Sequence, residues 1–103
     1  MKSEDLQLIQ DLDPDSDPEN YYQVLQRLIN DGGAWQLEGF YGRSMMAAIN
    51  KGFCLLGKIS FNDYYGNKVP ARDEVKEGTK GSRQFVVANQ GEKWANLMEN
   101  IDI

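Results

Sequence analysis

The residues best suited to chemistry gather in one polar segment, residues 62–83. This segment combines ring faces that could stack on a base with amide, hydroxyl and cationic groups that suit an anion. A connection of 22 residues is long for a chain of 103 residues, and long loops without regular structure often carry function. Its candidate binding residues are Tyr64, Tyr65, Asn67, Lys68, Arg72, Lys80, Ser82 and Arg83.

Four consecutive residues near the end of this segment suit an anionic ligand. Lys80-Gly81-Ser82-Arg83 offers backbone N–H groups and two cations to a phosphate or a carboxylate. The P-loop sequence GxxxxGK[ST] is absent, so the pattern does not predict an NTPase. A solvated loop with glycine turns, or a contact surface for another protein, would explain the same residues. The sequence leaves all three interpretations open.

Arg43 is the remaining candidate, and it lies outside the polar segment. In EGFYGRSMM it falls on an expected helix that otherwise carries little charge. One interpretation is an ion pair with Glu38 or with another acid. The other is an anchor for an anionic ligand beside the basic segment.

The side-chain inventory argues against an enzyme. The chain has no histidine, which removes the usual general base, and Asp73-Glu74 are adjacent and therefore point apart. The absence of histidine and a single cysteine also exclude a structural zinc site within one chain. The spaced aspartates of residues 11–17 lack the glycine and the bidentate glutamate of a calcium loop. We therefore expect no catalytic residue, no metal and no cofactor.

Charge is distributed unevenly along the chain. The net charge of −5 argues against general affinity for nucleic acid. Residues 1–20 hold seven acids against Lys2, a local charge of −6, whereas residues 51–83 hold seven bases against four acids, a local charge of +3. The sequence thus predicts an acidic protein with an acidic arm beside a basic middle. A DNA mimic built on that arm is disfavoured, because a Pro-rich stretch gives no rigid scaffold for its charges.

The clearest helix is expected over residues 18–31. Its apolar residues recur at helical spacing, Asp17 can cap its N-terminus, and Pro18 fits the first helical position. Gly32-Gly33 then ends the pattern.

Three further segments predict helices. Residues 37–51 carry an apolar stripe that ends at Lys51-Gly52, so residues 18–51 together predict a helical hairpin. A short helix is expected over residues 3–12, and a closing helix over residues 91–101.

Three short apolar runs predict strands. Residues 53–56 read as a buried strand, residues 58–61 as a weaker one, and residues 84–88 (QFVVA) as the best β run of the chain. Turn residues cluster at 65–68 and at 77–82.

These elements predict an α+β fold, in which the helical hairpin and a C-terminal helix pack on a small antiparallel sheet. The length is that of one domain. We expect an acidic N-terminal arm or linker over residues 1–17 and a single α+β domain over residues 18–103.

The sequence predicts a cytoplasmic protein without a membrane segment. No apolar run approaches the roughly 20 residues that cross a bilayer, and the start MKSEDLQ lacks a signal-peptide core. The single cysteine, Cys54, lies between Phe53 and Leu55 and is expected to be a buried apolar residue.

Three runs, YGRSMMAAINKGFCLLG, DYYGNKVPARDEV and GTKGSRQFV, resemble small uncharacterised proteins of bacteriophages and other mobile elements. The resemblance covers roughly residues 35–88. It implies a non-enzymatic accessory or anti-defence role, in which the protein inhibits a host protein by binding it or sequesters a nucleotide signal. It transfers no binding or catalytic residue to this chain.

The leading hypothesis is therefore a non-catalytic interaction protein of phage type that binds a host protein through the acidic arm and the 62–83 segment. A homodimer is the default oligomeric state. The alternative is a binder of an anionic small molecule, nucleotide or nucleic acid, with Arg43 and the cations of residues 62–83 around the anion. Ligand binding requires these cations to converge, whereas a protein contact surface can leave them dispersed.

Overall fold

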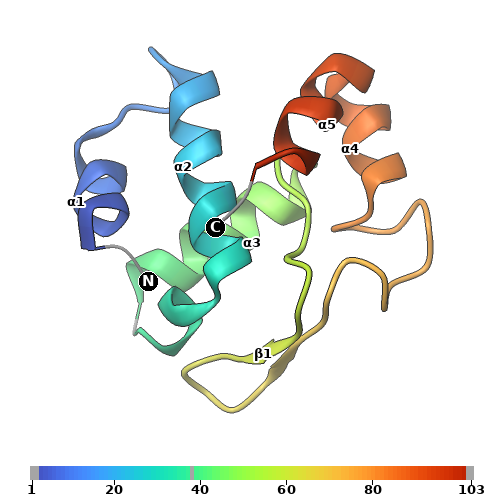
Figure 1. Ribbon diagram of the computed structural model, residues 1–103. Coiled ribbons are helices and arrows are strands. Elements are labelled where there is room, and N and C mark those ends of the chain that lie inside the picture. Colours follow the sequence, from blue (N-terminus) through green and yellow to red (C-terminus); the bar gives the residue numbers. More distant parts are fainter. Residues whose placement is uncertain (1–2, 38, 102–103) are drawn as a thin grey trace.

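The computed structural model describes residues 3–37 and 39–101. In these residues a first group of helices is followed by one short β-hairpin and then by two further helices (Figure 1). The helices are α1 (Ser3–Asp11), α2 (Pro18–Asp31), the 3-10 helix η1 (Gly33–Gln36), α3 (Phe40–Asn50), α4 (Arg83–Gln90) and α5 (Glu92–Glu99). The strands are β1 (Phe61–Asn62) and β2 (Lys68–Val69), which pair antiparallel with Phe61 opposite Val69.

Helix α2 has the ends that its sequence predicts. The Asp17 carboxylate accepts a hydrogen bond from Asn20 N at 3.4 Å, and Pro18 occupies the first turn. At the other end Gly32 has a φ of 84°, and its N–H donates to Leu28 O at 3.0 Å. A left-handed cap of this kind favours glycine, so α2 ends at Asp31, directly before Gly32.

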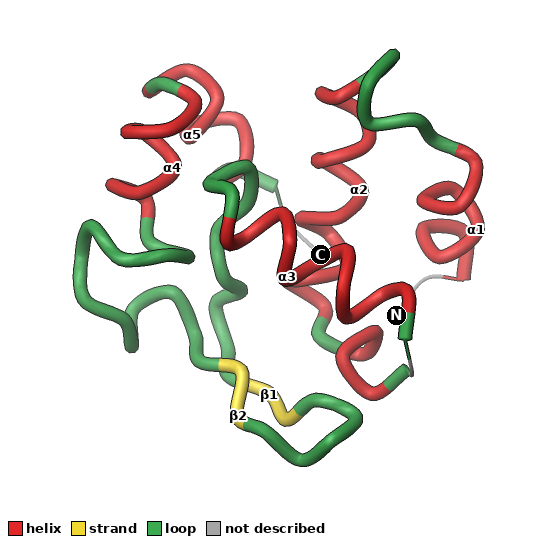
Figure 2. The backbone as a smooth tube through the Cα atoms, turned by 180° about the vertical axis from the view of Figure 1, so that it is seen from behind, coloured by secondary structure: helices red, strands yellow, loops and turns green. Residues whose placement is uncertain are grey.

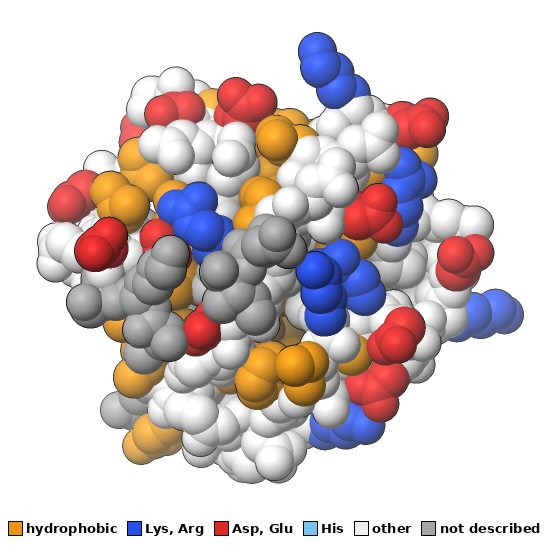
Figure 3. All heavy atoms as spheres, viewed as in Figure 1, with side chains coloured by type: hydrophobic (Ala, Val, Ile, Leu, Met, Phe, Trp, Pro, Cys, Tyr) orange, Lys and Arg blue, Asp and Glu red, His pale blue; other side chains and the backbone are white. Residues whose placement is uncertain are grey.

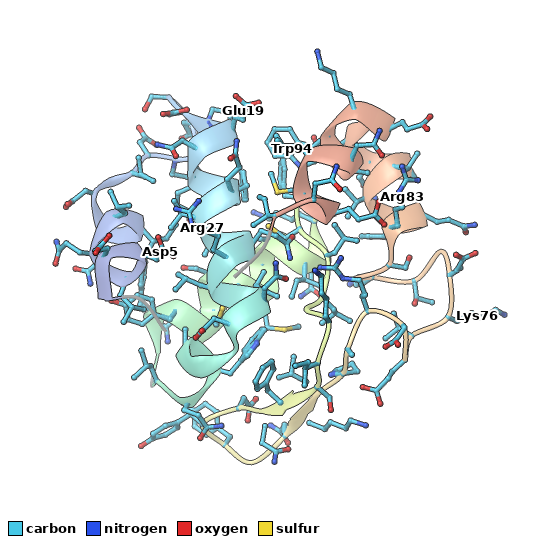
Figure 4. All side chains as sticks on the ribbon, viewed as in Figure 1. Asp5, Glu19, Arg27, Lys76, Arg83 and Trp94 are labelled. Atoms are coloured by element: carbon cyan, nitrogen blue, oxygen red, sulfur yellow. The ribbon has the colours of Figure 1, made fainter. Side chains whose placement is uncertain are left out.

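Helix α1 packs on α2 and contributes to the core. Its Ile9 is 1 % exposed, and Arg27 of α2 reaches both carboxylate oxygens of the buried Asp5, with Nη2 3.0 Å from Oδ1 (Figure 4). Part of the acidic segment expected as an arm over residues 1–17 is thus tied to the remainder of the fold. The physical reason is that a guanidinium fork matches a carboxylate in two parallel hydrogen bonds.

The prediction of a strand at residues 53–56 is wrong, because this segment has no regular secondary structure. The prediction that its side chains are buried is confirmed for residues 54–56. Cys54 and Leu55 are fully buried, but no strand pairs with this segment in the described part of the chain. Phe53 N and Cys54 N donate to Ala48 O at the end of α3, at 2.9 and 3.2 Å. Leu55 N donates to the side chain of Gln26 at 2.8 Å. The end of α3 and the Gln26 side chain therefore accept the backbone hydrogen bonds that a neighbouring strand would accept in a sheet.

The expected strand at residues 84–88 is also wrong, because these residues form α4. The Ser82 hydroxyl caps this helix by accepting a hydrogen bond from Phe85 N at 3.3 Å. Val86 is buried, and α4 packs against α5 (Figure 1). Local capping and packing on a neighbouring helix thus outweigh the β propensity of the run QFVVA. The closing helix expected over residues 91–101 is confirmed as α5.

The small sheet is a hairpin that begins at Phe61 and otherwise lies in the segment expected to be a loop, residues 62–83. Of the expected strand at residues 58–61, only Phe61 belongs to β1, and β2 was not predicted. The turn between the strands is confirmed: Gly66 has a φ of 83°, and Asp63 Oδ1 accepts from Tyr65 N and Asn67 N at 2.9 and 2.8 Å. An Asx-type turn holds the tip of the hairpin.

The fold class is confirmed as a mixture of helices and a small antiparallel sheet. Helix packs on helix in the pairs α1–α2, α2–α3 and α4–α5, whereas β1 packs on η1. Two-residue strands are too short to serve as a platform for helices. In the described residues no helix is long and apolar enough to cross a membrane.

Candidate functional site

The β1–β2 hairpin lies at the end of the molecule below α3 (Figure 2). A pocket of about 300 Å³ is lined by residues of α3, of η1 and of the turn of this hairpin. Arg43 of α3 lines it together with Tyr64 and Tyr65 of the hairpin, which unites three of the predicted site residues. We call it the Arg43 pocket. Its other lining residues are Trp35, Leu37, Gly39, Gly42, Met46 and Asp63.

A second pocket, of about 310 Å³, adjoins the first. Trp35, Met46 and Asp63 line both pockets. We call the second one the Lys80 pocket, because Lys80 lines it with two further predicted residues, Asn67 and Lys68. Its remaining lining residues are Ile49, Asn50, Leu56, Val69, Pro70 and Val75.

Large side chains around the Arg43 pocket are unusually exposed. Tyr65 is 72 % exposed, Tyr64 51 % and Met46 40 %, and Phe40, one helical turn before Arg43, is 43 % exposed. The Arg43 side chain is exposed, and its guanidinium has no hydrogen bond or ion pair with any residue that the structure describes. Glu38, its expected partner, lies outside the described residues. We call Phe40, Arg43, Met46, Tyr64 and Tyr65 together the α3 face.

Trp35, which lines both pockets, carries an unsatisfied donor. It is 2 % exposed, and its Nε1–H has no hydrogen-bond acceptor among the described residues. A buried donor without a partner costs about 1–3 kcal/mol. The other tryptophan, Trp94, follows the usual rule, since its Nε1 donates to Phe53 O at 2.8 Å.

Arg72, by contrast, serves the core. Its Nε donates to Leu56 O at 2.8 Å, and its Nη2 donates to Asn30 Oδ1 at 3.3 Å. Burial lowers the pKa of the Arg72 guanidinium from its usual value. These bonds tie the segment after β2 to α2, so Arg72 does not join the residues that line the two pockets.

Ser82 and Arg83 organise α4. The Ser82 hydroxyl donates to Thr79 O at 2.7 Å and accepts from Gly78 N at 3.0 Å, in addition to capping the helix. Arg83 Nε donates to Glu99 Oε1 at 3.3 Å, and its Nη2 donates to the Asn96 side chain. Neither residue lines the Arg43 pocket or the Lys80 pocket.

Lys68 lines the Lys80 pocket and also forms an ion pair with Glu74. Its Nζ lies 3.0 Å from Glu74 Oε2, but both side chains are largely exposed, so the pair is weakly stabilising. Glu74 Oε1 also accepts from Ala71 N at 2.8 Å, and these two hydrogen bonds hold the pKa of Glu74 below its usual value.

The predicted site residues therefore fall into two groups. Arg43, Tyr64, Tyr65, Asn67, Lys68 and Lys80 line adjoining pockets, and Arg72, Ser82 and Arg83 take part in internal networks. Figure 3 shows Lys and Arg side chains spread across the visible face and interspersed with acids, without one dense cluster.

Sequence reasoning missed Trp35, Met46 and Asp63, which line both pockets. One signal for Met46 was available, because it lies one helical turn after Arg43. Trp35 gave no such signal, since a tryptophan that follows Ala34 and precedes Leu37 by two residues is typical of a core segment. Asp63 enters the site through the hairpin, which the sequence did not predict.

Another pocket, of about 480 Å³, separates α2 from α5. Glu19 and Trp94 stand on its two sides (Figure 4), and Gln90, Lys93, Asn96, Leu97 and Asn100 complete its lining. None of the predicted site residues lines it.

We expect Cys54 to be almost inert to thiol reagents in the folded protein. The side chain is fully buried, as predicted, and burial raises the pKa of the thiol above its usual value. Labelling with iodoacetamide, followed by mass spectrometry, should be slower by on the order of 100-fold or more in buffer than in denaturant. Equal rates in both solvents would contradict the burial of this residue.

Comparisons with protein-family models, with curated proteins and with solved structures find no match to this chain. In the part of the chain that the structure describes, no three or more Cys, Asp or Glu residues are grouped so that they could hold a metal ion. The α3 face and the two pockets are the candidate functional surfaces of the protein.

Proposed function

We propose that this protein is a non-catalytic interaction protein that binds another protein through the α3 face. The observation that supports this proposal is that three exposed side chains, Met46, Tyr64 and Tyr65, line one pocket with Arg43. The exposed Phe40 lies one helical turn before Arg43, and the Arg43 side chain has no partner among the described residues.

The composition of this face supports the proposal. Tyrosine, methionine, phenylalanine and arginine are the residue types enriched at protein interfaces, and tyrosine and arginine dominate their binding energy. Exposed apolar side chains that gather on one face commonly mark a contact site. The Arg43 pocket adds a concave point at which a partner side chain can insert.

The charge of the face indicates the chemistry of the partner. Arg43 is the exposed cation at its centre, so the partner should present a carboxylate surrounded by apolar or aromatic groups. The resemblance of residues 35–88 to phage accessory proteins supports a host protein as that partner, bound in an anti-defence role in the cytoplasm. A second copy of this chain is the competing occupant.

The test is affinity capture from a bacterial lysate, followed by measurement of the dissociation constant with the purified partner. We expect Arg43→Ala and Tyr65→Ala each to weaken binding by about 30-fold, the equivalent of about 2 kcal/mol for an interface hot spot. Ile59→Ala is the matched control, because Ile59 is 63 % exposed but lines neither pocket.

Two results would contradict the proposal. One is a partner whose affinity falls equally in the Ile59 variant and in the α3-face variants. The other is a concentration-dependent dimer, measured by sedimentation, that Tyr65→Ala dissociates, because the face would then be occupied by a second copy.

A further inference from the structure

We propose that the Arg43 pocket and the Lys80 pocket form one binding site for a phosphorylated compound that carries an aromatic ring, of about the size of a mononucleotide. This site goes beyond the protein contact proposed above. It depends on Trp35 and Lys80, which are not part of the α3 face, and it does not use Phe40.

The two pockets are joined at Trp35, Met46 and Asp63, which line both of them. Met46 is 40 % exposed and has an unbranched side chain, so a change of rotamer can widen the junction at low cost. Each pocket, at about 300 and 310 Å³, lies at the lower end of the range found for small-molecule sites.

The charge around the site suits an anion. Three cations line the two pockets (Arg43, Lys68 and Lys80), against one carboxylate, that of Asp63. The Lys68 ammonium is already paired with Glu74, so Arg43 and Lys80 are the two cations available to a ligand. Asp63 Oδ1 already accepts two backbone N–H groups of the hairpin turn. Lys80 is exposed and has no ion pair in the described chain. In a protein of net charge −5, this excess of cations favours a phosphate over a neutral ligand.

Trp35 supplies an independent observation. Its buried Nε1–H lacks an acceptor among the described residues, and Trp35 lines both pockets. A ligand oxygen that enters beside Met46 would give this donor the hydrogen bond it lacks. The cost of the unsatisfied donor would then be recovered when the ligand binds.

The ring of the ligand is assigned to the Arg43 pocket. Tyr64 and Tyr65 line this pocket, and their rings meet edge to face with centroids 5.0 Å apart. Both side chains are more than half exposed, which leaves ring surface free to stack on a planar group. The Arg43 guanidinium can stack on the same group or bind its exocyclic oxygen.

The test is a titration of the full chain with adenosine 5′-monophosphate, observed in ¹H–¹⁵N correlation spectra. The chain has two tryptophans and therefore two indole N–H signals. We expect the Trp35 signal to move downfield as its donor gains an acceptor. The Trp94 signal is an internal control, because its donor is already bonded to Phe53 O.

Two ligand analogues and two lysine variants locate the groups involved. Adenosine, which lacks the phosphate, and ribose 5-phosphate, which lacks the ring, should each bind at least about 10-fold more weakly. Lys80→Ala should weaken binding of the nucleotide by about 5- to 10-fold. Lys76→Ala is the matched control, since Lys76 belongs to the same segment, lines neither pocket and points away from the body of the protein (Figure 4).

Several outcomes would overturn the proposal. These are an unmoved Trp35 signal at millimolar nucleotide, equal binding of adenosine and its monophosphate, or equal effects of the two lysine variants. Phe40→Ala separates this site from the protein contact, because it should weaken capture of the protein partner and leave nucleotide binding unchanged. Failure of either proposal can thus be recognised without the other.

Discussion

We expect Gln26→Leu to lower the free energy of unfolding by about 2–5 kcal/mol. Gln26 is fully buried, and its side chain forms two hydrogen bonds to the backbone of one residue. Leu55 N donates to Gln26 Oε1 at 2.8 Å, and Gln26 Nε2 donates to Leu55 O at 2.9 Å. Leucine would leave both backbone groups buried and unsatisfied.

The effect should extend beyond these two bonds, because Gln26 belongs to a larger network. Its Nε2 also lies 3.0 Å from Asn30 Oδ1, and Asn30 Nδ2 donates to Ile101 O at 2.9 Å. Arg72 donates to the same Asn30 oxygen. The side chains of α2 thereby connect the segment after α3, the segment after β2 and the end of the chain beyond α5.

Chemical denaturation followed by circular dichroism measures this loss. Gln23→Leu is the matched control, since Gln23 lies one turn earlier on α2, is half-buried and has no hydrogen bond of its side chain in the described chain. Its stability should change by less than about 0.5 kcal/mol. If both variants were equally stable, the hydrogen bonds of Gln26 to the Leu55 backbone would not contribute to stability as proposed.

We expect Gly32→Ala to destabilise the protein by about 2–4 kcal/mol. Two costs add at this position. The φ of 84° is unfavourable for any residue with a Cβ, and the new Cβ would lie 2.1–2.3 Å from ring atoms of Phe61. Phe61 packs against the core from β1, so its ring must move and the hairpin with it.

Gly66→Ala isolates the first of these costs. Gly66 has nearly the same φ, 83°, but no atom lies within 4 Å of the added Cβ. Its substitution should cost about 1 kcal/mol from backbone strain alone. In a Phe61→Ala background the cost of Gly32→Ala should fall to this value, as measured in a double-mutant cycle. An unchanged cost in that background would contradict the assigned clash.

Elements whose signals are local could be predicted from the amino-acid sequence alone. The capping pair Asp17-Pro18 and the glycine at position 32 fix the ends of α2 without help from distant residues. The Tyr65–Lys68 turn follows equally from local chemistry, since Gly66 and the Asp63 carboxylate close it. Five of the six predicted site residues that line the two pockets belong to the 62–83 segment, which stands out in the sequence because it is polar, aromatic and rich in turns.

Contacts between distant parts of the chain determine whether an apolar run forms a strand and whether a cation is available to a ligand. Residues 53–56 and 84–88 carry the same β signal, but the former take their hydrogen bonds from Gln26 and the end of α3, and the latter become helical on the Ser82 cap. Arg72 and Lys80 look alike in the sequence, but Arg72 is bonded to Leu56 O and Asn30 while Lys80 remains exposed beside a pocket. Hydrogen-bond partners and burial come from residues far apart in the chain, so no local pattern can specify them.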